Sequence, residues 1–204
     1  MTSHADVTVL PLVIVLASGR GERFTASGGA VHKLAALLAG KPVLQHTIDA
    51  VRESGLALHV EAAPHAGMGD SIAAAVGATR RRAGQGGWLI LPGDLPLVLP
   101  ATLRRLADAL AEGHDVVLPI VRGQRGHPVA FAARFGDALA TLTGDAGARS
   151  VVAQQAVSLL ELNDDGCITD VDTLDALARA EALLAERRSA GISPSALRSG
   201  PAAR

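Results

Sequence analysis

Apolar runs alternate along the chain with segments in which apolar residues recur at helical spacing. The runs at 7–16, 56–62, 88–91, 115–121, 126–131, 157–162 and 166–171 predict strands. Helical spacing predicts helices over 42–54, 72–82, 101–112, 134–142, 148–155 and 174–188. This alternation favours a three-layer α/β domain with a mainly parallel sheet covered on both faces. Ligands bind such sheets beyond the carboxyl ends of the strands, so the turns that follow strands are the candidate sites.

The predicted domain occupies residues 1–188. At 204 residues the chain is long enough for one domain to bury a proper core. Residues 189–204 are rich in Ser, Ala, Pro and Gly, have no apolar period, and are predicted to be a disordered tail. The stretch at 25–32 is predicted to be a mobile loop.

Composition narrows the classes of function. Hydrophobic residues make up 49% of the chain and aromatic residues only 2%, so Leu, Val, Ile and Ala must build the core. The net charge of −1 gives no electrostatic reason to expect nucleic-acid or membrane binding. The single cysteine, Cys167, excludes an internal disulfide framework and is predicted to be a small apolar residue of a strand rather than a nucleophile. The sequence has no long apolar span and no signal-peptide pattern, so we expect a cytoplasmic protein.

The turn after the first predicted strand carries the strongest functional signal. It reads Leu-Ala-Ser-Gly-Arg-Gly-Glu-Arg over residues 16–23, and its small residues let backbone N–H groups approach an anion. Arg23 and Lys33 supply the positive charge that a triphosphate needs. The turn is not a dinucleotide fingerprint, because Phe24 stands where the third glycine or alanine belongs, and the sequence has no Walker A loop. The structural alternative is a tight strand-to-helix connection with surface cations.

Carboxylates follow two other predicted strands. Asp94 lies in a rigid Pro-Gly-Asp-Leu-Pro turn, where it is placed either to hold Mg²⁺ or to cap the helix that begins near residue 101. Asp170 and Asp172 come at the end of the predicted strand at 166–171, and strand alternation places them on the same side. Asp172 or Thr173 is also a good N-cap for the next helix. Asp94 and Asp172 together would match a clamp on a magnesium-bound triphosphate.

Weaker signals come from three other turns. Residues 67–71 open a predicted helix whose amides favour an anion or a base, and Ser71 is either its N-cap or a ligand contact. His127 is placed to lie in a cleft, although an isolated histidine is more often structural. Asp145 is a turn residue for which a contact with substrate is the alternative.

Taken in order, these motifs resemble the MobA-like nucleotidyltransferases. The signature turn is residues 16–23 with Lys33, and the motifs at 67–71, 91–98, 126–128, 142–149 and 170–173 resemble the molybdenum cofactor cytidylyltransferase branch. The resemblance covers about residues 10–186. It implies a Rossmann-like nucleotidyltransferase fold and the transfer of CMP from CTP to the phosphate of molybdopterin, with release of pyrophosphate. It also implies Mg²⁺ as the cofactor and a molybdenum hydroxylase as a client.

The resemblance further implies roles for particular residues. Arg23, Lys33 and Asp94 would be catalytic, and Asp94 with Asp172 would hold Mg²⁺. The residues that bind the nucleotide and the molybdenum cofactor would be Leu16, Ala17, Ser18, Gly19, Gly21, Ser71 and His127. The last two would lie near the base or ribose and on the cofactor side, respectively. Because the phosphate of molybdopterin would be the nucleophile, no reactive cysteine or Ser-His pair is needed.

The chain departs from the family pattern in three places. The loop at 25–32 is longer than usual, which affects how Lys33 approaches the turn. The segment between Gly55 and Gly67 is short, so the sheet is predicted to lack one strand-helix unit of its relatives. Ser18 replaces the usual alanine or glycine; serine is closer in shape to the alanine of the cytidine branch, which favours CTP over GTP.

Two other functions stay open. One is a nucleotidyltransferase that acts on a sugar phosphate or another small phosphate. The other is a non-catalytic protein that binds and delivers the molybdenum cofactor. The short segment at 55–67 favours the delivery protein, whereas the intact Arg23, Lys33, Asp94 and Asp172 count against it.

Overall fold

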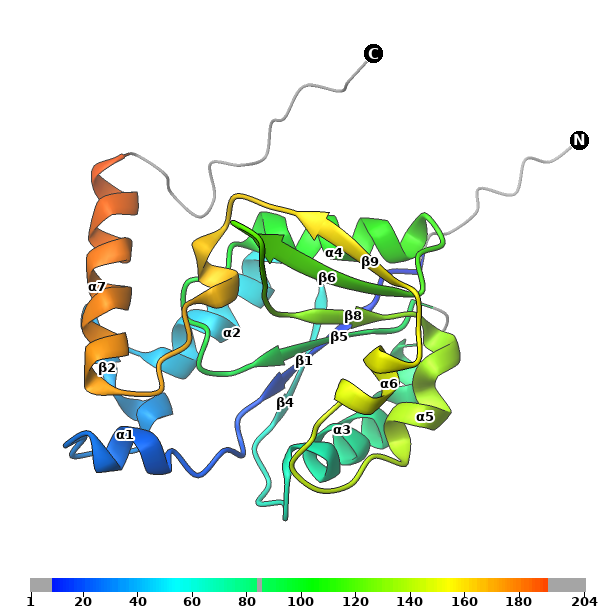
Figure 1. Ribbon diagram of the computed structural model, residues 1–204, viewed down its shortest axis with the longest axis horizontal. Helices are drawn as coiled ribbons and strands as arrows, with labels where there is room; N and C mark the ends of the chain where they lie inside the picture. Colours follow the sequence, from blue (N-terminus) through cyan, green and yellow to red (C-terminus); the bar gives the residue numbers. More distant parts are fainter. Residues whose placement is uncertain (1–8, 84–85, 191–204) are drawn as a thin grey trace, which may run out of the picture.

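The computed structural model describes residues 9–83 and 86–190. Residues 1–8, which include the start of the first predicted strand, residues 84–85, and residues 191–204 of the predicted tail lie outside these ranges. Figure 1 shows a twisted sheet with helices on both faces and α7 (Leu174–Ser189) at one end of the molecule. Within the described ranges, no helix is long and apolar enough to cross a membrane.

The main sheet has seven strands and is mainly parallel, as predicted. Strand β1 (Leu12–Leu16) lies between β4 (Ala57–Glu61) and β5 (Trp88–Pro92) and runs parallel to both. Beyond β5, the short β8 (Val129–Phe131) runs antiparallel between β5 and β6 (Val116–Val121). In register, the last residue of β1 pairs with the last residues of both β4 and β5. Three parallel strands therefore end together at one edge of the sheet.

The remaining strands extend the sheet or stand apart from it. Strand β9 (Val157–Glu161) pairs parallel with β6, and β7 (Gln124–Arg125) forms an antiparallel pair with the end of β6. A separate two-stranded sheet joins β2 (Leu37–Leu38) to β3 (Lys41–Pro42).

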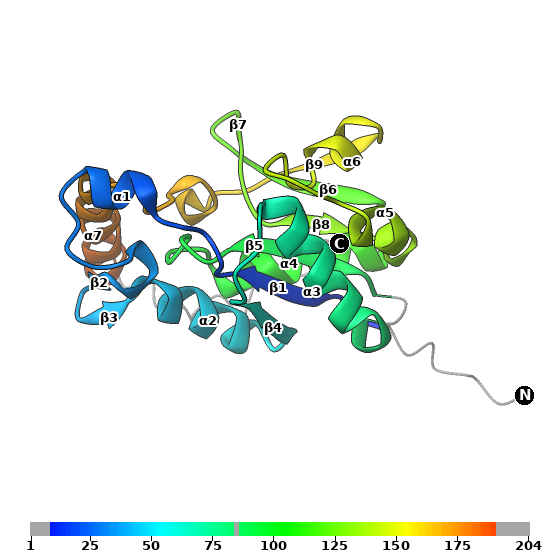
Figure 2. The ribbon, with the colours of Figure 1, turned by 90° about the horizontal axis from the view of Figure 1, so that it is seen from below.

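The helices form two layers, one on each face of the sheet (Figures 1 and 2). Helices α2 (Val43–Ser54) and α4 (Pro100–Ala111) cover one face. Helices α3 (Met68–Ala83), α5 (Gly136–Ala140) and α6 (Arg149–Ala153) cover the other. Because side chains alternate along a strand, each central strand contributes to both of the cores that these layers enclose.

A third, smaller core holds the chain after the first turn. It joins α1 (Glu22–Ala26) and the 3-10 helix η1 (Lys33–Ala35) to α7, with Phe24 and Leu34 buried among their neighbours. Phe24 thus anchors the first turn in this third core. This role explains why an aromatic residue stands where dinucleotide-binding turns have a small one. The predicted loop at 25–32 is wrong at its start, because residues through Ala26 belong to α1.

The predicted strand at 166–171 is wrong. Residues Asp165–Ile168 form a 3-10 helix, η3, because the side chain of Asp164 accepts a hydrogen bond from the Gly166 N–H, and such local bonds compete with strand pairing. Gly166 also packs so closely on the backbone of Leu97 that a Cβ there would clash. Cys167 is therefore a buried apolar residue of a 3-10 helix, not of a strand.

Several predicted boundaries also shift. Helix α3 begins at Met68 rather than at residue 72, so Ser71 lies inside its first turn and is not the N-cap. The strand predicted over 126–131 begins only at Val129, as β8, and the short β7 ends before it at Arg125. Helix α7 runs through Ser189, the first residue assigned to the tail.

Candidate functional site

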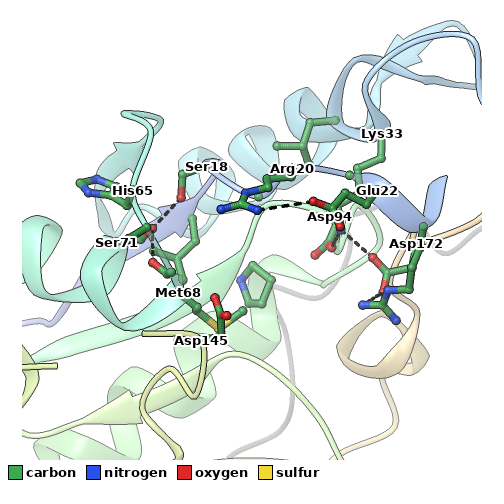
Figure 3. A pocket seen from close by; sticks show the side chains of 18 residues that line it. Ser18, Arg20, Glu22, Lys33, His65, Met68, Ser71, Asp94, Asp145 and Asp172 are labelled. Carbon is green, nitrogen blue, oxygen red and sulfur yellow. Dashed lines mark hydrogen bonds and ion pairs between the residues drawn. The ribbon is translucent and has the colours of Figure 1, made fainter. Parts of the chain in front are cut away.

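A cavity of about 410 Å³ opens at the edge where β4, β1 and β5 end (Figure 3). The turns at 17–23, 67–71 and 92–96 all contribute residues to this one cavity. Side chains and backbone from these turns, from η1 and from two later loops line it: Leu16, Ser18, Gly19, Arg20, Gly21, Glu22, Arg23, Lys33, Leu34, His65, Ala66, Gly67, Met68, Ser71, Pro92, Asp94, Asp145 and Asp172.

Backbone hydrogen bonds between adjacent strand ends set the spacing of the turns. The Ala17 N–H donates to the Glu61 carbonyl oxygen at 2.8 Å, and the Gly93 N–H donates to the Leu16 carbonyl oxygen at 2.9 Å. A Cβ at Gly93 would lie 2.8 Å from that same carbonyl oxygen, so a side chain there would push the two turns apart. Gly93 thereby holds Asp94 beside the first turn.

The first turn is shaped by a glycine and a histidine. Gly21 has a φ of 68°, a conformation that favours glycine, and a Cβ there would lie 3.2 Å from His32 Nε2. The Leu34 N–H donates to His32 Nδ1 at 3.3 Å, so Nε2 carries the proton and donates to the Gly19 carbonyl oxygen at 2.7 Å. His32 therefore ties the glycine turn to the segment that presents Lys33. Sequence reasoning missed His32, although its position next to Lys33 was the available signal.

Charged side chains meet at one end of the cavity. Lys33 Nζ lies 2.5 Å from Asp94 Oδ2 and 2.6 Å from Asp172 Oδ1, and Arg23 Nη2 lies 2.5 Å from Asp172 Oδ2. The side chains of Lys33, Asp94 and Asp172 are only 13–14% exposed, whereas that of Arg23 is 79% exposed. Figure 3 shows the two carboxylates converging from the β5 turn and from the segment before α7.

Local structure places Asp172 at this position. The Val171 N–H donates to the Asp94 carbonyl oxygen at 2.9 Å, and the Val171 side chain is fully buried. Thr173 is the N-cap of α7, with its hydroxyl accepting from the Ala176 N–H at 3.1 Å. Because Thr173 supplies the cap, Asp172 is free to face Lys33. Asp170, by contrast, is exposed and does not line the cavity.

The ion pairs perturb the acid–base behaviour of this cluster. Burial opposes the charge of Lys33, but Asp94 and Asp172 outweigh it and raise the pKa of that ammonium group. Burial would likewise raise the pKa of Asp172, but its hydrogen bond to Lys33 and the charges of Lys33 and Arg23 hold that pKa below its usual value. Both groups are therefore charged at neutral pH.

The donor set fits a divalent cation. Asp94 Oδ1 is buried and has no hydrogen-bond partner among the described residues, and an unsatisfied carboxylate oxygen is costly unless a ligand meets it. The alternative cap role for Asp94 is wrong, because α4 has Leu99 as its N-cap and no side chain caps it. The described residues contain no group of three or more His, Cys, Asp or Glu that could hold a metal. Mg²⁺ commonly uses one or two carboxylates and takes the rest of its shell from phosphate and water.

The other end of the cavity is lined by uncharged hydroxyls. Ser18 Oγ and Ser71 Oγ are 2.7 Å apart, and Ser71 donates its hydrogen to the Gly67 carbonyl oxygen at 3.1 Å. The start of α3 is held in place by the loop before α6, because the Gly69 N–H donates to the Gly144 carbonyl oxygen at 2.7 Å. Asp145 follows in the same loop and lines the cavity.

A buried carboxylate supports this end and was missed by sequence reasoning. Glu61 ends β4 and accepts hydrogen bonds at 3.1 Å from both the Ala63 N–H and His65 Nε2, while His59 Nε2 lies 3.4 Å away. Burial would raise the pKa of Glu61, but these bonds hold it below the ordinary value. His65 in turn lines the cavity. The signal available was a histidine between a strand end and a glycine-rich turn.

Two predicted site residues lie outside the cavity lining. Ala17 packs against the third core instead of facing the cavity. His127 is exposed, and its N–H donates to the Cys167 carbonyl oxygen at 2.9 Å.

Comparison with known sequences identifies a family. The model described as a MobA-like NTP transferase domain matches residues 51–159, just over half of the chain. Bifunctional protein GlmU from Bordetella petrii is 28% identical over 139 residues, which cover 56% of this chain and 30% of that protein. The chain therefore spans less than a third of the length of this curated relative.

Solved structures agree on the fold. Rv0371c from Mycobacterium tuberculosis H37Rv has a TM-score of 0.71 at 25% identity, covering 86% of this chain and 98% of that one. Its complex with manganese has a TM-score of 0.67 at 24% identity, over 85% of this chain and 98% of the other. Molybdopterin-guanine dinucleotide biosynthesis protein A from Archaeoglobus fulgidus has a TM-score of 0.62 at 18% identity, covering 86% of this chain and 99% of that one. With the family model matched over more than half of its residues, and with the fold and turn order expected of that family, the chain belongs to the MobA-like NTP transferase domains.

Proposed function

We propose that this chain is a Mg²⁺-dependent nucleotidyltransferase that transfers CMP from CTP to the phosphate of molybdopterin and releases pyrophosphate. One observation carries the proposal: a single cavity brings a glycine turn and two cations together with a pair of carboxylates. Such an arrangement supplies both what a triphosphate needs and what its divalent counter-ion needs.

In this proposal the triphosphate lies along the first turn. The backbone N–H groups around Gly19 and Gly21 approach its oxygens, and a Cβ at Gly19 would meet nothing within 4 Å, so the turn is open to a ligand. Arg23 and Lys33 bind the phosphate oxygens and stabilise the charge that develops on the leaving pyrophosphate.

Asp94 and Asp172 would hold Mg²⁺, with Asp94 Oδ1 as the oxygen that has no other partner. The bound cation would supply positive charge to the phosphate oxygens at the reacting phosphorus. The manganese complex of Rv0371c supports the use of a divalent cation. An oxygen of the acceptor phosphate attacks the α-phosphorus, and the bond from that phosphorus to the bridging oxygen of pyrophosphate breaks. Cys167 takes no part, because burial raises the pKa of its thiol and the side chain is inaccessible.

The choice of CTP and molybdopterin rests on the end of the cavity with the hydroxyls and on the order of the motifs. Ser18 and Ser71 supply hydrogen-bonding groups where the base or ribose would lie. His127 lies outside the cavity lining, and in this proposal it would be on the molybdopterin side. The structural likeness to a protein named for molybdopterin-guanine dinucleotide biosynthesis supports the fold that this reaction would use.

The test is release of pyrophosphate from the purified chain with CTP, Mg²⁺ and molybdopterin. We expect release only when all three are present. Asp94→Asn should slow it on the order of 10³-fold or more, since the cation loses a charged ligand at the reacting phosphate. Asp137→Asn, which changes an exposed carboxylate that pairs with Arg80 outside the cavity, should leave the rate within about twofold.

Each of the other possible results would favour a different function. Pyrophosphate release with a sugar phosphate but not with molybdopterin would change the acceptor and keep the reaction class. Tight binding of molybdopterin with no pyrophosphate release from any nucleoside triphosphate would overturn the enzyme proposal in favour of a delivery protein. An unchanged rate in Asp94→Asn would show that Asp94 is only a turn residue.

A further inference from the structure

In this structure the ammonium group of Lys33 bridges the two carboxylates that the proposed function gives to the divalent cation (Figure 3). Its Nζ lies 2.5 Å from Asp94 Oδ2 and 2.6 Å from Asp172 Oδ1, and all three side chains are largely buried. Arg23 occupies the remaining oxygen of Asp172. Of the four carboxylate oxygens, only Asp94 Oδ1 has no partner in the described part of the chain.

A divalent cation that binds both carboxylates therefore competes with Lys33 for the same oxygens. Two cations cannot occupy one bridging position, because their repulsion at contact distance would exceed the attraction of either for a shared oxygen. Displacing Lys33 without a new partner would leave a buried ammonium group uncompensated, which is strongly unfavourable. A cation alone should then bind this chain poorly, although two carboxylates point into the cavity.

A nucleoside triphosphate changes this balance. The first turn is open at Gly19, and Gly19 and Lys33 line the same cavity. The phosphates of a bound nucleotide would offer the ammonium group of Lys33 new anionic partners. In the free chain, two cations and two carboxylates satisfy one another. When a triphosphate and its divalent cation arrive together, Lys33 can pass to the phosphates and the carboxylates to the incoming cation, so that every charge keeps a partner.

We propose that Lys33 is an internal counter-ion that closes the divalent-cation site until a nucleoside triphosphate draws it away. The proposal rests on the proposed function and adds an order to it: the cation binds with or after the nucleotide, not before. By linkage, the nucleotide and the cation then raise each other's affinity by the same factor.

The test measures binding of Mn²⁺ to the nucleotide-free chain, from the loss of the electron paramagnetic resonance signal of free Mn²⁺. Wild type should bind weakly, and CTP should strengthen binding roughly 5–150-fold, the usual range of such coupling. Lys33→Met should bind Mn²⁺ without nucleotide at least about tenfold more tightly than wild type. Lys33→Gln, which keeps a polar end but no charge, should behave in the same way and serves if the Met variant does not fold.

Two controls separate a bridging role from a general change of charge. Lys41→Met removes a lysine that pairs with Asp49 at 2.9 Å outside this cavity, and should leave Mn²⁺ affinity unchanged. Arg23→Met removes an exposed cation that touches only Asp172, and should raise the affinity much less than the Lys33 variants. Adding Asp94→Asn to Lys33→Met should remove the gain.

Unchanged or weaker Mn²⁺ binding in both Lys33 variants would overturn the counter-ion role, as would an equal gain in Arg23→Met. Failure of the proposed function would look different. In that case no nucleoside triphosphate would bind wild type in the presence of Mn²⁺, whereas the nucleotide-free comparison of variants would still give its own answer.

Discussion

The Ser71 hydroxyl donates its hydrogen to the Gly67 carbonyl oxygen, so in the bond between the two serines Ser18 is the donor and Ser71 the acceptor. The oxygen of Ser18 therefore offers only lone pairs to a ligand in the cavity. A base edge that carries an amino group, as cytosine does, matches these acceptors, whereas the corresponding carbonyl of uracil does not. The hydroxyl also fills space that a glycine would leave for a larger base.

Replacing Ser18 by Gly should shift nucleotide preference from CTP towards GTP. An unpaired buried polar group costs about 1–3 kcal/mol, so the ratio of the two affinities should change by roughly 5–150-fold. The measurement is a thermal-shift series with CTP, GTP, ATP and UTP in the presence of Mg²⁺, since a ligand that binds the folded chain raises its melting temperature. A larger shift of wild type with GTP than with CTP would contradict the cytidine assignment.

At the scale of residues, the charged site residues were easier to predict than the ion pairs that they form with one another. Lys33, Asp94 and Asp172 could be chosen from charge and position after strands, and the structure brings them together. Their direct bridge was not predictable, because it joins residues 61 and 139 positions apart. His32 escaped notice for the same reason, since its main partner is the carbonyl of a residue 13 positions away.

Among the elements, η3, α4 and α7 are tied together by one buried carboxylate. Asp164 is 2% exposed and accepts from the Leu99 N–H at 2.9 Å, from Thr102 Oγ1 at 2.7 Å and from Arg187 Nη2 at 2.8 Å. It thus satisfies the N–H of Leu99, the N-cap residue of α4, and neutralises the charge of Arg187 in the last helix. By holding α7, it also supports the segment that presents Asp172.

Asp164→Ala should destabilise the fold by about 3–5 kcal/mol, because it leaves the largely buried guanidinium of Arg187 unpaired and the Leu99 N–H without its acceptor. Urea unfolding followed by circular dichroism measures the loss. Asp137→Ala removes an exposed carboxylate from an ion pair and should cost under about 1 kcal/mol. Equal losses in the two variants would show that the bonds of Asp164 contribute no more to stability than an exposed ion pair does.

The elements themselves were largely predictable where one period dominates the sequence. Helices such as α4 and α7 follow apolar spacing, and the buried strands β1 and β5 follow continuous apolar runs. The exception is the segment at 166–171, whose apolar residues suit a strand. There the Asp164 side chain accepts a hydrogen bond from the Gly166 N–H and favours a 3-10 helix. The position of Asp164 depends in turn on its bonds with Leu99 and Arg187, which are distant in the sequence.

For the molecule as a whole, stability should fall on acidification. Burial lowers the pKa of His46. Despite burial, hydrogen-bonding partners also lower the pKa of Asp49, Glu61 and Asp172. A group with a depressed folded pKa stabilises the fold above its unfolded pKa, and this contribution is lost as pH falls through the folded value. The raised pKa of Lys33 acts in the opposite direction, and its contribution is lost only at strongly alkaline pH.

Urea midpoints should therefore be highest between about pH 7 and 9. They should decline below about pH 6.5, where His46 takes up a proton more readily in the unfolded chain than in the fold, and fall further below about pH 4 for the same reason at the carboxylates. Glu61→Gln should be less stable than wild type at pH 7 and should lose less stability between pH 7 and pH 3.5. A midpoint that rises on acidification from pH 5 to pH 3 would contradict this account.

The architecture was predictable to the level of layers but not of strand order. Alternating strands and helices indicate a mainly parallel sheet, as found. The sequence does not reveal that β8 runs antiparallel between β5 and β6. Its three residues are all apolar, a pattern that suits a parallel and an antiparallel strand equally. The predicted absence of one strand-helix unit relative to the family stays a prediction, as does the boundary at residue 188.

The bond between Lys33 and Asp172 joins residues 139 positions apart, so the ribosome makes them at different times. A ribosome adds about 5–20 residues per second, so Asp172 follows Lys33 by roughly 7–30 seconds. Throughout that interval the nascent chain carries the proposed phosphate-binding turn without the second carboxylate of the proposed cation site. A message cut short after the sheet is encoded would thus yield a chain with most of its core but an unfinished site. Synthesis itself delays the chemistry until the last helix is being made.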